Sequence, residues 1–310
     1  MPCYHPLKGV RGGVNSNGKR PLLFNYNIVS TSNLIPTLVP CGQCVGCRLE
    51  YSRQWAMRCM DEAQMHKENS FITLTYDDQH LPVDRSLDKR VFQLFMKRLR
   101  KKVKAPIRYF HAGEYGDKYG RPHYHACIFG YSFPDRKFLK KTGSGYNIYM
   151  SSALQEVWEN GYSSCADFSF ETAAYVARYC LDKVRISEKS NDVMKEKYEK
   201  RYVDQSTGVL RIPEYTTMSR RPGIGYSWFN KYKSDMFPFG TKVVNGVESK
   251  CPRYYDYLYG KENARDFARL KAERNSLINI FENTTMRLLV KEEVVLNKIS
   301  KLKREFEYSL

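Results

Sequence analysis

The sequence predicts an α+β protein built on an antiparallel sheet with helices packed on one face. Strand-like segments alternate with segments of helical periodicity, in the order strand, helix, strand, strand, helix, strand, helix. Two of the strands are joined by a short turn, which favours an antiparallel hairpin. Of the 310 residues, 42% are hydrophobic and 14% aromatic, which is enough for a packed core.

The first half of the chain supplies most of the expected sheet. We expect loops or short strands over residues 1–40, a helix over 48–66, a strand over 71–76, a helix over 88–103 and strands over 106–112 and 123–130. The segment Phe71–Tyr76 is β-branched and aromatic and is closed by two aspartates. Residues 116–122 form the turn of the hairpin, because they contain two glycines and a proline.

The second half begins with two expected helix caps. Ser151 or Ser152 caps a short helix that ends at Gly161, a strand over 162–170 follows, and Ser169 caps a helix that reaches about residue 183. The last fifty residues are rich in Lys and Glu with apolar residues at helical spacing, which predicts amphipathic helices.

The charge of the chain favours a polyanionic partner. Its 51 Lys and Arg residues against 33 Asp and Glu give a formal net charge of +18, and its 24 tyrosines offer faces that stack on unpaired bases. A basic surface without a partner is the alternative. The N-terminal residues lack an apolar signal-peptide segment, and no run of about 18 apolar residues occurs, so we expect neither a secretory signal nor a membrane span.

His123-Tyr124-His125 is the first candidate for chemistry. On a strand, residues two apart point to the same side, so both imidazoles can bind one divalent cation. Glu114, on the neighbouring strand before the turn, can add a carboxylate, and this set suits Mg²⁺ or Mn²⁺. His111 competes as third ligand but should face the opposite way. Structural histidines and an ordinary exposed acid are the alternative interpretation.

Tyr175 and Tyr179 are the candidate nucleophiles. They are four residues apart on an expected helix and share one face, where two phenols can attack phosphodiesters in alternation. Arg178 and Lys183 are placed to steady the scissile phosphate. A simple tyrosine packing pair beside a solvated helix surface explains the same residues without catalysis.

A cysteine cluster stands apart from these residues. Cys41, Cys44 and Cys47 can reach one metal ion, with Cys3 or His5 as a fourth ligand, and thiolates in a tetrahedral set suit structural Zn²⁺. Free thiols are an equally good explanation, and an iron–sulfur cluster is a weaker one. The remaining cysteines are expected to be small buried residues. They are Cys59, Cys127, Cys165, Cys180 and Cys251.

Taken in order, these motifs resemble those of the HUH endonucleases, and most closely the replication initiator proteins of the microviruses, in particular the gokushovirus branch. The resemblance covers most of residues 1–230. It rests on residues 40–48 (PCGQCVGCR), 73–78 (TLTYDD), 113–116 (GEYG), 121–125 (RPHYH) and 175–179 (YVARY).

The resemblance implies a five-stranded antiparallel sheet with the metal-binding histidines at its centre. It implies nicking of the viral strand at the origin, a 5′-phosphotyrosine at Tyr175 or Tyr179, and re-ligation of a circle. It also implies a host helicase as partner and the cytoplasm of a bacterial host as location; the chain itself has no GxxxxGK[ST] phosphate loop. One departure is Asp182, which stands where related motifs often carry Lys, with Lys183 one residue later.

On this basis the chain divides into four segments. They are residues 1–67 with the cysteine cluster and first helix, 68–190 as the nuclease core, 191–260 as an irregular extension, and 261–310 as C-terminal helices. Two other functions fit the same residues. One is a non-catalytic basic module that binds nucleic acid, and the other is a related single-strand transposase or relaxase.

Overall fold

The computed structural model describes residues 3–16, 20–24, 35–116, 120–143, 145–182, 192–204, 208–244, 246–279 and 281–301. Their contacts divide the chain into two units. The first comprises Met1–Tyr51 and Leu277–Leu302, and the second Ser52–Ser276 and Lys303–Leu310. None of the described helices is long and apolar enough to cross a membrane.

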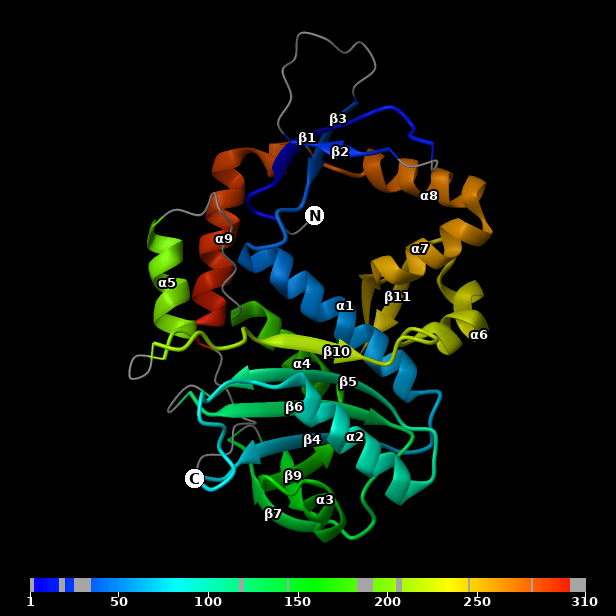
Figure 1. Cartoon of the computed structure of the whole chain (residues 1–310). Coiled ribbons are helices and arrows are strands. Elements are labelled where there is room, and N and C mark those ends of the chain that lie inside the picture. The colour runs from blue at the N-terminus through cyan, green and yellow to red at the C-terminus, as the bar shows by residue number, and fades with distance from the viewer. Residues whose placement is uncertain are drawn as a thin grey trace. The chain divides into compact units, whose positions relative to one another are not determined.

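A seven-stranded antiparallel sheet lies at the centre of the second unit, in the order β10-β5-β6-β4-β9-β8-β7 (Figure 1). The strands are β4 (Asn69–Tyr76), β5 (Arg108–Tyr115), β6 (Pro122–Phe129), β7 (Lys137–Lys141), β8 (Asn147–Met150), β9 (Gly161–Asp167) and β10 (Tyr215–Met218). The α+β class is therefore confirmed, but the expected number of five strands is wrong. The additional strands lie at the sheet edges, and they are short or rich in lysine, so the hydrophobic pattern does not reveal them.

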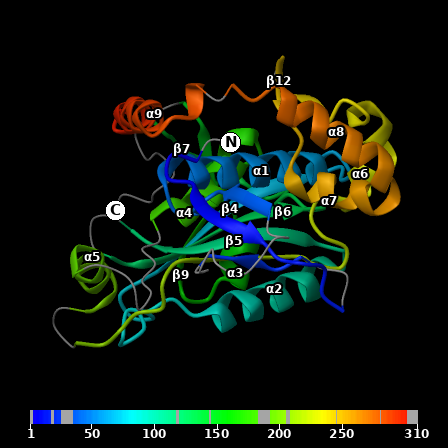
Figure 2. The same cartoon turned by 90° about the horizontal axis from the view of Figure 1, so that it is seen from above.

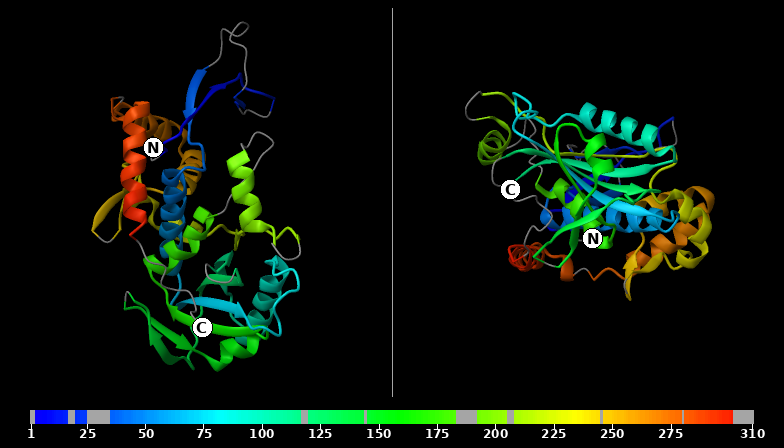
Figure 3. Two further views of the ribbon diagram at one scale, coloured as in Figure 1. Left: turned by 90° about the vertical axis from the view of Figure 1, so that its left-hand side faces the viewer. Right: turned by 90° about the horizontal axis from the view of Figure 1, so that it is seen from below.

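Helices cover both faces of this sheet, so the prediction of helices on one face is wrong. Helices α2 (Lys89–Val103) and α3 (Ser152–Val157) pack on one face, where Phe95, Leu99 and Trp158 meet Leu74 and Tyr124. Helix α4 (Phe170–Asp182) and the later turns of α1 (Val45–Ala63) pack on the other (Figures 2 and 3). Every residue of β6 is buried, and a strand with two buried faces requires a layer on each side.

The expected helix caps are confirmed. The hydroxyl of Ser151 accepts a hydrogen bond from the Leu154 amide at 3.0 Å, and that of Ser169 accepts one from the Thr172 amide at 3.2 Å. Glu171 lies in the first turn of α4, where the helix dipole favours a negative charge. The ends of α3 and α4 that face the sheet are thus fixed by local sequence.

The later part of the second unit is more regular than its composition suggested. It contains α5 (Asp192–Tyr202), α6 (Tyr226–Met236), β11 (Thr241–Val244), β12 (Val247–Lys250), α7 (Arg253–Glu262) and α8 (Ala264–Ser276). Buried side chains of α6, α7 and α8 form a core of their own. Two buried acids at the end of α1 join this core to the sheet: Asp61 accepts from the Tyr255 hydroxyl at 2.7 Å, and Glu62 accepts from Arg108 of β5 at 2.5 Å.

The first unit consists of a small sheet, the start of α1 and the C-terminal helix. Its strands are β1 (Leu7–Arg11), β2 (Leu22–Leu23) and β3 (Ile35–Val39), in the antiparallel order β2-β1-β3. A 3₁₀ turn, Phe281–Asn283, precedes α9 (Thr285–Ile299). The short strands expected in residues 1–40 and the helices expected near the C-terminus are therefore present.

Candidate functional site

The two histidines of β6 point to the same side of the sheet, together with Glu114. The register pairs Glu114 of β5 directly with His123, and Ala112 with His125, so these four side chains share one face. His125 Nε2 lies 2.5 Å from the nearer carboxylate oxygen of Glu114. All three polar side chains are buried, with exposed fractions of 8% for His123 and 1% each for His125 and Glu114. We call the side of the sheet that carries His123, His125 and Glu114 the histidine face.

Two threonines of β4, which our sequence analysis missed, hold the imidazoles. Thr73 Oγ1 lies 3.0 Å from Nδ1 of His125, and Thr75 Oγ1 lies 2.9 Å from Nδ1 of His123. Both contacts follow from the register, which places Thr73 opposite His125 and Thr75 opposite His123. Because Nδ1 is occupied in each ring, Nε2 is the nitrogen that faces away from β4, and in His125 it meets the Glu114 carboxylate. The alternation of polar and apolar residues in Thr73-Leu74-Thr75, which puts both threonines on one side of the strand, was the feature of the sequence that could have predicted these contacts.

Gly116 lies against the Nε2 end of the His123 ring. A Cβ at this position would lie 2.5 Å from His123 Nε2, closer than side-chain atoms tolerate, so only glycine leaves room for the ring. This explains the glycine that follows Glu114 and Tyr115 in the sequence.

Burial keeps both histidines neutral. Burial, assisted by the charge of Arg121, lowers the pKa of His123 to about 4. Burial, with contributions from His123 and His111, lowers the pKa of His125 well below its ordinary value. Neutral imidazoles are the form that binds metal ions.

His111 lies on the opposite face of the sheet. Its ring stacks on Phe92 of α2 with 3.5 Å between ring centroids, and its Nδ1 lies 2.9 Å from the hydroxyl oxygen of Thr217. Burial holds its pKa well below the ordinary value. Because side chains along β5 alternate between the two faces of the sheet, His111 and Glu114, three residues apart, point to opposite faces, as the sequence predicted.

Tyr175 of α4 packs directly on the histidine face. Its ring meets that of His125 edge to face at 5.3 Å between centroids and that of Phe71 at 6.1 Å. It is 3% exposed. The backbone of Arg178 and Tyr179 continues α4, but their side chains and the whole of Lys183 lie outside the described residues. Of the four candidate residues Tyr175, Arg178, Tyr179 and Lys183, Tyr175 is the one whose side chain is among those described.

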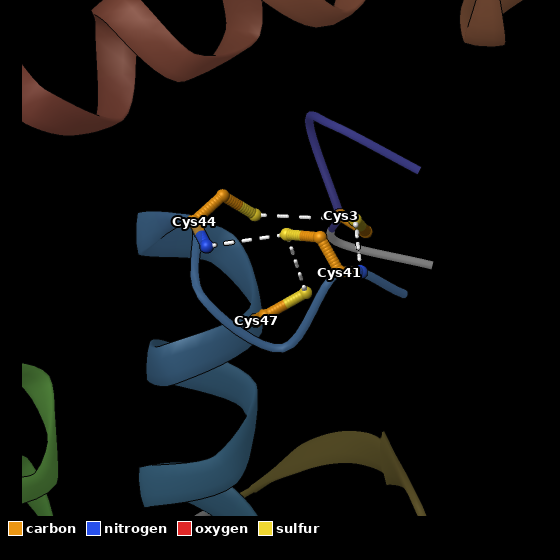
Figure 4. A group of neighbouring side chains, drawn as sticks. All are labelled: Cys3, Cys41, Cys44 and Cys47. Atoms are coloured by element: carbon orange, nitrogen blue, oxygen red, sulfur yellow. Dashed lines mark hydrogen bonds between the residues drawn. The ribbon is translucent and has the colours of Figure 1, made fainter. Parts of the chain in front are cut away.

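The cysteine cluster is assembled in the first unit. Cys3, Cys41, Cys44 and Cys47 have sulfur atoms that all lie within 4.8 Å of one another (Figure 4). Cys41 and Cys47 are 4.0 Å apart, as are Cys3 and Cys44. Cys3 is thus the fourth member, whereas His5 Nε2 lies 2.5 Å from Glu292 of α9.

The environment of the four thiols is unequal. Burial disfavours ionisation of Cys44, but hydrogen bonds from the amides of Tyr4 and Cys47 and from neighbouring thiols lower its pKa to about 7. Burial raises the pKa of Cys41 and of Cys47. A Cys44 thiolate that is available near neutral pH favours metal capture by the cluster.

The other cysteines for which side chains are described behave as expected. Cys59, Cys127, Cys165 and Cys251 are all buried, and the side chain of Cys180 lies outside the described residues. Among the described residues, the four-cysteine cluster is the one group of three or more His, Cys, Asp or Glu side chains with ligand atoms this close together.

Comparison with known proteins defines the class. The family model described as replication-associated protein ORF2/G2P matches residues 69–184, which include the histidine face and all of α4. Replication-associated protein VP4 of Bdellovibrio phage phiMH2K is 33% identical over 282 residues, 88% of this chain and 82% of the relative. Replication-associated protein ORF2 of Spiroplasma virus 4 is 30% identical over 286 residues, 86% and 83% of the two chains.

A third relative, replication-associated protein ORF4 of Chlamydia phage 1, is 30% identical over 237 residues, 74% of this chain and 55% of its own length. No solved structure matches the chain. The chain belongs to the family of microvirus-type replication initiator proteins, which confirms the resemblance found in the sequence motifs.

Proposed function

We propose that this protein nicks single-stranded or origin DNA through a covalent phosphotyrosine at Tyr175 and later rejoins the strand. The observation that carries the proposal is the packing of the Tyr175 ring on His125, 5.3 Å between centroids, on the face that also presents His123 and Glu114. A nucleophile, two neutral imidazoles and a carboxylate are thereby gathered from three separate elements.

The donor set suits a divalent cation, Mg²⁺ or Mn²⁺. The contact between His125 Nε2 and Glu114 at 2.5 Å needs a shared proton, because a lone pair and a carboxylate oxygen would otherwise repel each other. A cation can replace that proton and draw on both atoms. The ligand atoms of His123, His125 and Glu114 do not all lie within 4.8 Å of one another, as the four cysteine sulfurs do. Small rotations of these side chains are therefore needed to bring their ligand atoms together on one ion.

When bound, the cation would neutralise charge that develops on the scissile phosphate. The residues of the chain supply the rest. The phenol oxygen of Tyr175 attacks phosphorus and its proton passes to solvent. The bond from phosphorus to the 3′ oxygen breaks as the new bond forms, and the 3′ oxygen takes up a proton and leaves as a hydroxyl, so the phosphodiester energy is conserved for rejoining. Thr73 and Thr75 hold the imidazoles in one orientation throughout.

Tyr175 must leave its present packing to meet DNA, because its side chain is 3% exposed and its hydroxyl oxygen is buried. Tyr179, one helical turn further along α4, serves as the second nucleophile in this scheme. Arg178 and Lys183 are the proposed cations that steady the phosphate. The net charge of +18 draws the DNA to the protein.

The same proposal places the protein in the cytoplasm of a bacterial host, with a host helicase as partner that unwinds the duplex. The sequence supports this division of labour, because it contains no complete phosphate loop: Gly18-Lys19 is followed by arginine and Gly260-Lys261 by glutamate, where the motif needs Ser or Thr.

Incubation of the purified protein with circular single-stranded phage DNA and Mn²⁺ tests the proposal. We expect nicked DNA on a denaturing gel and a covalent adduct that mass spectrometry maps to Tyr175 or Tyr179. Tyr175→Phe should remove the adduct at residue 175, and His123→Ala should abolish nicking. DNA binding without any adduct would instead support a non-catalytic binding module. Cleavage of transposon ends, and not of phage origins, would support a transposase.

A further inference from the structure

We infer that Cys3, Cys41, Cys44 and Cys47 bind one Zn²⁺ ion that holds the first unit together. This site is separate from the histidine face and does not depend on the proposed nicking reaction. The four side chains come from three places in the sequence: the segment before β1, the loop after β3, and the first turn of α1 (Figure 4).

The geometry of the sulfur atoms fits a tetrahedral metal. A Zn–S distance of about 2.3 Å places the four sulfurs of a tetrahedron about 3.8 Å apart. Here two sulfur pairs are 4.0 Å apart and all four lie within 4.8 Å, so a small contraction is enough. A disulfide would require sulfurs at about 2.0 Å and would leave the pairs without a common centre.

Backbone amides around the cluster are aimed at the sulfurs. Amides of Cys44 and Gln43 donate to Cys41 Sγ at 3.3 and 3.4 Å, the amide of Cys41 donates to Cys3 Sγ at 3.3 Å, and the amide of Tyr4 donates to Cys44 Sγ at 3.4 Å. Four thiolates and one Zn²⁺ carry a net charge of −2, and these donors, with the N-terminal end of α1, stabilise it. The thiol protons pass to solvent on binding.

The described residues of the first unit bury few apolar side chains. Among its described residues, the buried apolar side chains are Cys3, Val10, Cys44 and Leu288, and none belongs to a hydrophobic core cluster. A segment this poor in buried apolar surface usually needs a metal or disulfides to fold. The cluster supplies that link, because it ties the segment before β1 to the end of β3, whose Val39 pairs with Leu7.

Zinc is the ion that this donor set selects. Four thiolates in a closed tetrahedron are typical of structural zinc, which has no redox chemistry and no open coordination position. The four sulfur atoms all lie within 4.8 Å of one another, so together they would fill the four positions of a tetrahedral ion and leave none for a substrate. The site is therefore structural.

Metal analysis of the full-length protein, purified without added metal, tests the inference. We expect about one zinc per chain. Cys41→Ser should lose the zinc, and Cys165→Ala should keep it, since Cys165 is a buried thiol of β9 outside the cluster. Cobalt exchanged for zinc should give the absorption of a tetrahedral tetrathiolate in the wild type.

A second measurement covers the case in which Cys41→Ser does not fold. Alkylation of the native wild-type protein, followed by peptide mass spectrometry, should show the four cluster thiols reacting at least about 10-fold more slowly before zinc removal by a chelator than after it. Iron in place of zinc, an absence of bound metal, or two disulfides among the four cysteines would each overturn the inference.

Discussion

The threonines of β4 give the sharpest test of the histidine face, through the substitution Thr75→Val. Valine replaces the hydroxyl by a methyl group of similar size and keeps the β-branched shape that suits a central strand. It removes the partner of His123 Nδ1, at present 2.9 Å away. Thr75 is 2% exposed, so water cannot easily take the place of the hydroxyl.

The expected losses of stability and of metal affinity in Thr75→Val follow from that burial. An unsatisfied buried nitrogen costs about 1–3 kcal/mol of folding free energy. Loss of the group that orients a metal-binding histidine weakens metal affinity or activity by about 10- to 100-fold. The assay is the rate of nicking of single-stranded DNA as a function of Mn²⁺ concentration. The half-saturating Mn²⁺ concentration should rise by that factor, and the rate at saturating Mn²⁺ should return close to that of the wild type.

Thr217→Val is the matched control. Thr217 makes the same kind of hydrogen bond, at 2.9 Å, to Nδ1 of His111 on the other face of the same sheet. It should cost a similar amount of stability in urea denaturation and leave the Mn²⁺ dependence unchanged. Equal Mn²⁺ dependence of Thr75→Val and Thr217→Val would refute the reasoning, because His123 would then not contribute to metal binding.

Three further predictions concern the surroundings of the site. Gly116→Ala would place a Cβ 2.5 Å from His123 Nε2 and should reduce the rate of nicking at least about 10-fold. Gly13→Ala is the control, because its Cβ would meet nothing within 4 Å, and it should leave the rate unchanged. Equal nicking rates of the two variants would contradict the close contact between residue 116 and the His123 ring. Glu62→Ala removes a buried carboxylate that accepts three hydrogen bonds and should lower the free energy of unfolding, measured with urea, by about 3 kcal/mol. Exposed Glu68→Ala should change it by less than about 0.5 kcal/mol. Because the pKa of His123 falls from 6.5 to about 4 on folding, the unfolded chain protonates first as the pH drops. The urea midpoint measured without added metal should therefore be maximal above pH 6.5 and decline between pH 6.5 and 4, and the decline should be smaller in His123→Gln.

Local patterns were enough to predict the centre of the fold. The segment Phe71–Tyr76 makes up the last six residues of β4, and β5 and β6 pair as the antiparallel hairpin that the sequence predicts. Period-two alternation then places His123 and His125 on one side, and the hairpin register brings Glu114 opposite His123. These relations depend on neighbours along the chain or across one hairpin, which is why sequence reasoning reaches them.

Other features depend on contacts between distant segments. Tyr215–Met218 pairs with β5 although the paired residues are far apart in the chain (106 residues between His111 and Thr217), and its four residues carry no strong strand signal. The pairing of β4 with β6 that brings Thr75 to His123 spans 48 residues. The second helical layer was missed because His123 and His125 suggest an open polar face, whereas the structure buries them beneath α4.

The burial of the histidine face divides the proposed site into a fixed part and a moving part. His123 and His125 stand on β6 and Glu114 on β5, and hydrogen bonds with the threonines of β4 set the orientation of the two imidazoles. Their positions can change only by small side-chain rotations. Tyr175 instead stands on a helix that covers this face, held there by ring contacts to His125 and Phe71. If Tyr175 is the nucleophile, as we propose, DNA cannot reach it while its side chain is 3% exposed. Tyr175 and its helix are then the part that moves, and the cost of separating those rings adds to the barrier of the proposed nicking step.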